Sequence, residues 1–211
     1  KLLLNEKKTI DCIRRMQEFD LFQFVSPEMF KEPQELEVLE RLDSIFLSEE
    51  RIIVTGKPKV WYVYLLGLFY SLDEVAFLKA AKRLHLPNRL KNSLYEDRTH
   101  CRESLEKLIS KKKCEPVEIY HAFANLSVEG VVFLMALSST DRINKYANIY
   151  FTQYQGRVKP SLTGNDLAKM GVEPGPIFKF ILNALREARI EGSVKSREEE
   201  IALVEERFLK P

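Results

Sequence analysis

The chain has 211 residues, of which 45% are hydrophobic, so it can build one helical domain or two small ones around a buried core. The formal net charge of +2 excludes a strongly acidic or basic protein, but residues 51–114 carry 14 basic and only 6 acidic side chains. This basic middle suits either a surface for a polyanion or an ordinary solvated helix face, and charge alone leaves both interpretations open.

Cysteine usage and hydropathy indicate a cytoplasmic protein with no membrane association. The chain has 3 cysteines, none spaced as CxxC, which argues against a disulfide framework or a zinc site. The longest apolar run, VWYVYLLGLFY at 60–70, is too short to span a bilayer and is typical of a buried core helix. The opening KLLLNEKK starts without Met and resembles the last turn of a helix, so we expect further protein upstream.

The first quarter of the chain shows mainly helical periodicity. Apolar residues recur at helical spacing over 7–19, with Phe19 continuing the apolar stripe, and again over 34–47. Between them, Ser-Pro-Glu at 26–28 predicts a helix start, with Ser as N-cap and Pro in the first turn. RIIVT at 51–55 is the one β-like run, and it has no partner.

The rest of the body is also predicted to be helical. Helices are expected at 58–69, from a capping-box-like Ser71–Glu74 to about 84, from Pro87 to about 112, from Pro116, after a Ser127 cap, and at 140–156. Without a paired strand or a fixed repeat, this pattern predicts an all-α chain of packed helical pairs. We place a helical body at 1–158 and a three-helix tail at 159–211.

The sequence shows no complete set of catalytic groups. Its aspartates never occur at the DxD spacing that metal-assisted phosphoryl transfer uses, and HExxH, GxSxG and P-loop patterns do not occur. Acidic residues such as Glu28, Glu96 and Asp97 lie in helical contexts and are interpreted as solvated surface charge. We therefore predict neither a catalytic residue nor a metal ligand in this chain.

The stretch LTGNDLAKMGVEPGPIFKFIL at 162–182 contains a Gly-Pro helix–turn–helix element. Thr163 can cap a short helix in a capping box with Asp166, and Gly171 suits the left-handed position after that helix. Pro176 then starts a second helix, which presents Lys179 and Arg186 opposite its apolar face. Free amides at such a turn suit a nucleic-acid phosphate, but a plain αα-hairpin uses the same residues.

The longer segment LTGNDLAKMGVEPGPIFKFILNALREARIEGSVKSREEEIALV at 162–204 resembles the tail of bacterial class II tRNA nucleotidyltransferases and their poly(A) polymerase relatives. The matched positions are Thr163, Gly164, Asp166, Leu167, Gly171, Pro174, Gly175, Pro176, Gly192, Arg197, Glu198 and Glu199. Residues 1–30 resemble the join between the neck and body of that family, and residues 61–94 resemble its body helices. The resemblance therefore covers most of the chain, and it is most specific in the last fifty residues.

The resemblance implies a parent enzyme that adds nucleotides to tRNA 3′ ends: A, CC or CCA, or a poly(A) tail. The catalytic head of that family, with its Gly-Ser turn, DxD carboxylates and Glu-Asp-x-x-Arg helix, does not occur in this sequence. Glu96-Asp97-Arg98 has the wrong spacing for the last of these motifs. Any ATP, CTP or Mg²⁺ is therefore expected at an N-terminal head, which would be a partner of this chain.

For the chain itself, the resemblance implies that body and tail hold the acceptor–TΨC arm of tRNA by backbone and shape contacts. The candidate contacts are Lys79, Lys82, Arg83, Arg89, Lys91, Arg98, Arg102, Thr163, Gly164, Lys169, Gly171, Gly175, Lys179 and Arg186. Each basic residue taken singly also fits an ordinary solvated charge. The alternative is a helical scaffold for protein interaction or oligomerisation with no RNA role.

Overall fold

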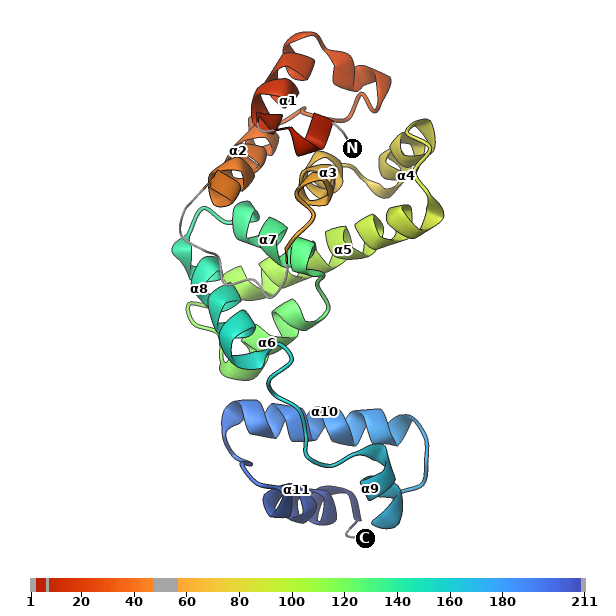
Figure 1. The fold of residues 1–211 in the computed structure, drawn as a ribbon, viewed down its shortest axis with the longest axis vertical. Coiled ribbons are helices and arrows are strands. Elements are labelled where there is room, and N and C mark those ends of the chain that lie inside the picture. Colours follow the sequence, from red (N-terminus) through yellow and green to blue (C-terminus); the bar gives the residue numbers. More distant parts are fainter. Residues whose placement is uncertain (1–2, 7, 48–56, 210–211) are drawn as a thin grey trace. The chain divides into compact units, whose positions relative to one another are not determined.

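A computed structural model describes residues 3–6, 8–47 and 57–209. Its described residues form helices and no strands, which confirms the predicted all-α class (Figure 1). The β-like run at 51–55 lies outside the described residues. The chain divides into two compact units: unit 1 comprises Lys1–Lys112 and Ala122–Asn148, and unit 2 comprises Lys113–His121 and Ile149–Pro211.

The helices follow one another with short connections. In chain order they are η1 (Leu3–Asn5), α1 (Thr9–Glu18), η2 (Leu21–Phe24), α2 (Pro33–Leu47), α3 (Val60–Tyr70), α4 (Glu74–Arg83), α5 (Asn88–Ser110), α6 (Pro116–Ala124), α7 (Val128–Leu137), α8 (Asp141–Ile149), η3 (Tyr150–Tyr154), α9 (Gly164–Lys169), α10 (Pro176–Glu191), α11 (Arg197–Val204) and η4 (Glu205–Leu209). Within the described residues, no single helix is both long and apolar enough to cross a membrane, and α6 and α7 pass that test only as a bent pair.

Unit 1 is built around α3 and α7, which are apolar on nearly every side and therefore buried on nearly every side. Helix α7 packs against α2, α3 and α5. Gly67 of α3 permits a close approach, because a Cβ there would lie 2.5 Å from Leu39 of α2 and 3.3 Å from the Phe133 ring of α7. The longest helix, α5, lies along this core and carries 5 of the 14 basic residues of the stretch 51–114 (Figure 1).

A buried carboxylate joins three helices of unit 1. Asp97 of α5 accepts hydrogen bonds from the Tyr62 hydroxyl of α3 at 2.7 Å, and from the hydroxyl and amide of Ser127 at 2.6 and 3.1 Å. The Ser127 hydroxyl also caps α7 by accepting from the Gly130 amide at 2.9 Å, as predicted. The interpretation of Asp97 as a solvated charge is wrong, because its side chain is only 5% exposed.

Three local predictions in unit 1 are also wrong. Ser26 does not begin a helix: the chain makes one turn, with Met29 N–H bonded to the Ser26 carbonyl at 3.2 Å, and Phe30 then takes a left-handed φ of 56°. Phe19 ends α1 and is 63% exposed, so it does not continue the buried stripe. Ser71 does not cap α4: the N-cap is Asp73, which accepts from the Ala76 amide at 2.7 Å.

The C-terminal part of unit 2 confirms the predicted helix signals. Capping boxes begin α9 at Thr163 and α11 at Ser196. Gly171 and Gly192, with φ of 92° and 76°, take the left-handed conformation where α9 and α10 end. The core of this tail is formed by Leu162, Leu167, Val172, Ile181, Leu185 and Val204.

Candidate nucleic-acid interface

The end of α4 and the start of α5 form a basic corner on unit 1. Lys79, Lys82 and Arg83 lie at i, i+3 and i+4 of α4, so they share one face of the helix. Arg89 and Lys91 follow in the first turn of α5, which contains no acidic residue. Among the described residues, none of these five cations forms a salt bridge. We call this set of five the α4–α5 corner.

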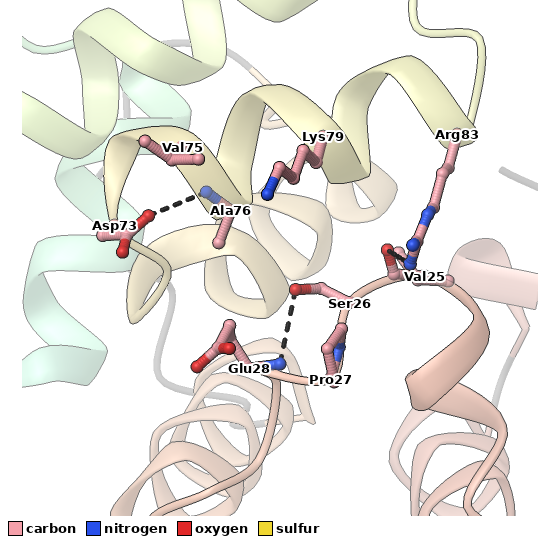
Figure 2. A pocket seen from close by; sticks show the side chains of 9 residues that line it. All are labelled: Val25, Ser26, Pro27, Glu28, Asp73, Val75, Ala76, Lys79 and Arg83. Carbon is pink, nitrogen blue, oxygen red and sulfur yellow. Dashed lines mark hydrogen bonds between the residues drawn. The ribbon is translucent and has the colours of Figure 1, made fainter.

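Two cations of this corner line a pocket of about 210 Å³ on unit 1. One wall is α4 and the other is the turn at Val25–Glu28 (Figure 2). The Arg83 guanidinium bridges the walls by donating to the Val25 carbonyl at 3.1 Å. Lys79 points into the pocket and has no hydrogen bond or ion pair with any described residue. The pocket thus holds a cation whose charge is available to a ligand.

The opposite side of the pocket is acidic. Glu28 and Asp73 both line it, together with the Ser26 hydroxyl (Figure 2). Glu28 is ion-paired with Lys31, and Asp73 uses one carboxylate oxygen to cap α4. These acidic and hydroxyl residues were absent from the predicted set, because no spacing in the sequence indicates that the 25–28 turn packs against α4.

Two predicted contact residues of α5 donate to backbone carbonyls of unit 1, and only Arg98 of the two is buried. Arg98 is 3% exposed, donates to the Leu72 carbonyl and stacks 4.5 Å from the centre of the Phe77 ring. Arg102 is exposed and donates to the carbonyls of Tyr70, the last residue of α3, and of Leu72. Both cations therefore stabilise the negative end of the α3 dipole. Burial lowers the pKa of Arg98 to about 10, so it is still charged at neutral pH.

The tail turn presents a largely open backbone. Gly175 precedes α10 with an extended φ of 167°, and a Cβ built there would meet nothing within 4 Å. No side chain caps the first amides of α10, and Pro176 occupies its first turn. Packing favours glycine at position 164, because a Cβ there would lie 3.1 Å from the Phe178 ring. The turn therefore combines a packed α9 with an exposed start of α10.

The cations of the tail are placed unequally. Lys169 and Lys179 are exposed at the end of α9 and in the first turn of α10. Arg186, two turns further along α10, is half-buried and donates to Asn183 Oδ1 at 3.1 Å. Lys179 is therefore the tail cation best placed beside the start of α10, which no side chain caps.

A network of ion pairs holds the three tail helices together. Glu200 of α11 is fully buried, accepts from the Ser161 and Leu162 amides at 2.9 and 2.8 Å, and is ion-paired with Arg189 of α10. Arg197 of α11 contacts Asp166 of α9 at 2.7 Å. No sequence pattern indicates these backbone contacts of Glu200, because the bonded residues are 38 and 39 positions apart.

The capping box of α9 changes the acidity of its carboxylate. The Thr163 hydroxyl and amide, followed by the Arg197 guanidinium, hold the pKa of Asp166 well below its usual range. Asp166 therefore stays ionised at every pH at which the protein is expected to work. The negative charge of Asp166 is paired with the Arg197 guanidinium of α11.

Within the described residues, no group of three or more His, Cys, Asp and Glu side chains is placed to hold a metal ion. The acidic pair of the pocket is too small a set for such a site, and each carboxylate already has a protein partner. The chemistry that the two surfaces support is binding: they offer cations, helix starts without a side-chain cap and a few hydrogen-bond acceptors.

Comparison with known proteins finds relatives along nearly the whole chain, although no protein-family model matches it. An A-adding tRNA nucleotidyltransferase of Geobacter sulfurreducens is 28% identical over 206 residues, which are 96% of this chain and 23% of that protein. An A-adding tRNA nucleotidyltransferase of Halalkalibacterium halodurans is 30% identical over 73 residues, covering 35% of this chain and 17% of that protein. The chain thus spans less than a quarter of the curated relatives it matches.

Solved structures share the fold. A CCA-adding enzyme in complex with ATP superposes with a TM-score of 0.77 at 21% identity, covering 99% of this chain and 49% of that one. The Thermotoga maritima CCA-adding enzyme complexed with tRNA gives a TM-score of 0.75 at 21% identity over 95% of this chain and 48% of that one. These matches confirm the resemblance predicted from the sequence: the chain is similar to the C-terminal body and tail of tRNA nucleotidyltransferases.

Proposed function

We propose that this chain is the tRNA-binding body and tail of a nucleotidyltransferase that adds A, CC or CCA to tRNA 3′ ends. In this role, the chain contacts the RNA backbone of the acceptor–TΨC arm and recognises the shape of that stem, so that the 3′ end stays at the site of nucleotide addition. The observation that carries the proposal is the similarity, over 96% of the chain, to an A-adding tRNA nucleotidyltransferase. A solved relative of the same fold was captured with tRNA.

Two surfaces support this role. The α4–α5 corner and the tail turn both offer cations beside exposed helix starts, which suits phosphate contacts rather than base reading. An A-form stem has a deep, narrow major groove that side chains cannot read, so grip by phosphate and shape is the expected mode. Arg98 is buried against the Leu72 carbonyl and the Phe77 ring, so it is the least accessible of the proposed contacts, whereas Arg102 is exposed and stays among them.

Catalysis would belong to a head domain in the part of the relatives that this chain does not match. ATP, CTP where the parent also adds cytidine, and Mg²⁺ would bind there, and a cytoplasmic location would follow from the substrate. We expect the chain alone to add no nucleotide to tRNA. Addition by the purified chain with ATP and Mg²⁺ would contradict this assignment.

The test is tRNA binding by the purified chain, followed by fluorescence anisotropy over a series of salt concentrations. We expect log affinity to fall linearly with log salt, with a slope of roughly 0.7 to 0.9 per phosphate contact. Replacing one cation that contacts a phosphate should reduce that slope by roughly 0.7 to 0.9, the contribution of one phosphate contact. The variants are Lys179→Gln in the tail and Arg89→Gln in the corner.

Lys145→Gln is the matched control, because Lys145 is an exposed lysine of α8 outside the predicted set. It should leave both the affinity and the slope unchanged. Equal losses in all three variants would indicate a diffuse charge effect and no defined interface. A chain that binds no tRNA at low salt, but forms concentration-dependent oligomers in solution, would favour the scaffold alternative.

A further inference from the structure

The pocket between α4 and the Val25–Glu28 turn differs from a simple anion site. Lys79 and Arg83 bring positive charge to it, whereas Glu28 and Asp73 bring negative charge (Figure 2). A bare phosphate would be attracted by the cations and repelled by the carboxylates within the same small volume. The pocket therefore suits a ligand that carries an anionic group and, a few ångströms away, hydrogen-bond donors.

The polar groups of the pocket are only partly used by the protein. Lys79 has no partner among the described residues, and Asp73 commits one of its two carboxylate oxygens to the Ala76 amide. The Ser26 hydroxyl accepts only a long contact of 3.4 Å from the Glu28 amide. An ionised carboxylate can only accept hydrogen bonds, so the acidic side selects donors such as hydroxyl groups.

The size of the pocket limits the ligand further. Its volume of about 210 Å³ is below the roughly 300–1,000 Å³ typical of sites for drug-sized molecules. It suits one sugar–phosphate unit better than a complete nucleoside triphosphate. In RNA, each such unit combines a phosphate with a ribose 2′-hydroxyl, which is the group that distinguishes RNA from DNA.

We propose that this pocket binds one ribose–phosphate unit of an RNA strand. Lys79 and Arg83 contact the phosphate, and the carboxylate of Glu28 or of Asp73 accepts the one hydrogen bond that the ribose 2′-hydroxyl can donate. The inference rests on the proposed tRNA-binding function and gives one of its surfaces a chemical selectivity. The turn at 25–28 thereby helps to recognise the ribose of RNA, a role that the distribution of charge along the sequence does not indicate.

The test compares two hairpins with the sequence of an acceptor–TΨC arm, one of RNA and one with 2′-fluoro sugars. The fluoro hairpin keeps the A-form but lacks the hydroxyl donor. Binding of the full chain to each is measured by anisotropy at one fixed salt concentration. We expect the chain to prefer the RNA hairpin by roughly tenfold, the value of one good hydrogen bond to a charged group.

The decisive variant is Glu28→Ala combined with Asp73→Asn, since asparagine keeps the N-cap of α4. It should lose most of the preference for RNA, while its affinity for the fluoro hairpin stays the same or rises as negative charge is removed. Lys79→Met should weaken binding to both hairpins equally. Glu103→Ala removes an exposed carboxylate of α5 outside the pocket and should leave the preference intact.

Several outcomes would overturn the proposal. If the double variant binds both hairpins more tightly by the same factor, the carboxylates act only as repulsive charge. If the chain binds both hairpins without preference, the pocket inference fails while tRNA binding stands. If it binds neither hairpin nor tRNA, both proposals fail together.

A free sugar phosphate could supply the same chemistry, so ribose 5-phosphate is titrated into the full chain by calorimetry. Saturable binding that Lys79→Met abolishes, without any preference between the hairpins, would assign the pocket to a small molecule. That result would overturn the RNA proposal. Thermal unfolding of each variant checks that the fold is retained.

Discussion

Replacing Glu200 by Gln should destabilise the tail, although glutamine has nearly the same shape. Glu200 is fully buried, accepts two backbone hydrogen bonds and is ion-paired with Arg189. Hydrogen bonds to a charged group contribute about 1.5–3 kcal/mol each, and breaking a buried ion pair by removing one partner costs about 3–5 kcal/mol. Arg189 is 21% exposed and can regain some hydration, and glutamine can still accept hydrogen bonds. We therefore expect a loss near the lower end, about 2–3 kcal/mol.

Native-state hydrogen exchange at the Leu162 amide is the most direct assay, because this amide donates to Glu200. Its protection should fall by about 30- to 150-fold, the equivalent of 2–3 kcal/mol. Glu191→Gln, at an exposed position near the end of α10, should leave the protection unchanged. Unchanged protection in Glu200→Gln would refute the reasoning, because it would mean that the carboxylate charge is not needed at this site.

Three further predictions concern the fold. The pKa of Asp166 is lowered in the folded state, so its contribution to stability is present above its unfolded pKa near 4 and is lost as the pH falls below that value. In acid titration, the free energy of unfolding of Asp166→Asn should therefore decrease less steeply with falling pH than that of the unchanged chain. Gly67→Ala should destabilise unit 1 by about 1–3 kcal/mol through overpacking, whereas Gly175→Ala, in open space, should cost little in chemical denaturation. Tyr62→Phe should cost about 1–2 kcal/mol by removing one hydrogen bond to Asp97, and an unchanged unfolding midpoint would contradict that bond.

Features that depend on neighbouring residues were predictable from the sequence. The capping boxes at Thr163 and Ser196, the left-handed glycine after α9 and the Ser127 cap all follow from interactions within four residues. The all-α class follows in the same way from helical periodicity. Some local signals were wrong, as at Ser26, where one turn forms but the left-handed φ of Phe30 ends it.

Features that depend on packing were not predictable. Asp97 and Arg98 look like surface charges in the sequence, but the neighbouring helices supply hydroxyls, an aromatic ring and carbonyl groups that make their burial possible. The pocket likewise depends on a turn that meets α4 about fifty residues later in the chain. Such tertiary contacts decide whether a cation is exposed to solvent or bonded to the end of a helix, and the spacing of residues along the chain does not predict them.

The Glu200 network has a consequence for how the tail is made. Helices α9 and α11, of 6 and 8 residues, are too short to be stable alone in water. The carboxylate that accepts from the Ser161 amide lies 39 positions later in the chain. A ribosome releases the chain from its N-terminal end, so the start of the tail lacks this acceptor until Glu200 has been made and released. A chain truncated before α11 would therefore lack the acceptor of the Ser161 and Leu162 amides and the ion-pair partner of Arg189, and α9 and α10 would lose stability together with the missing helix.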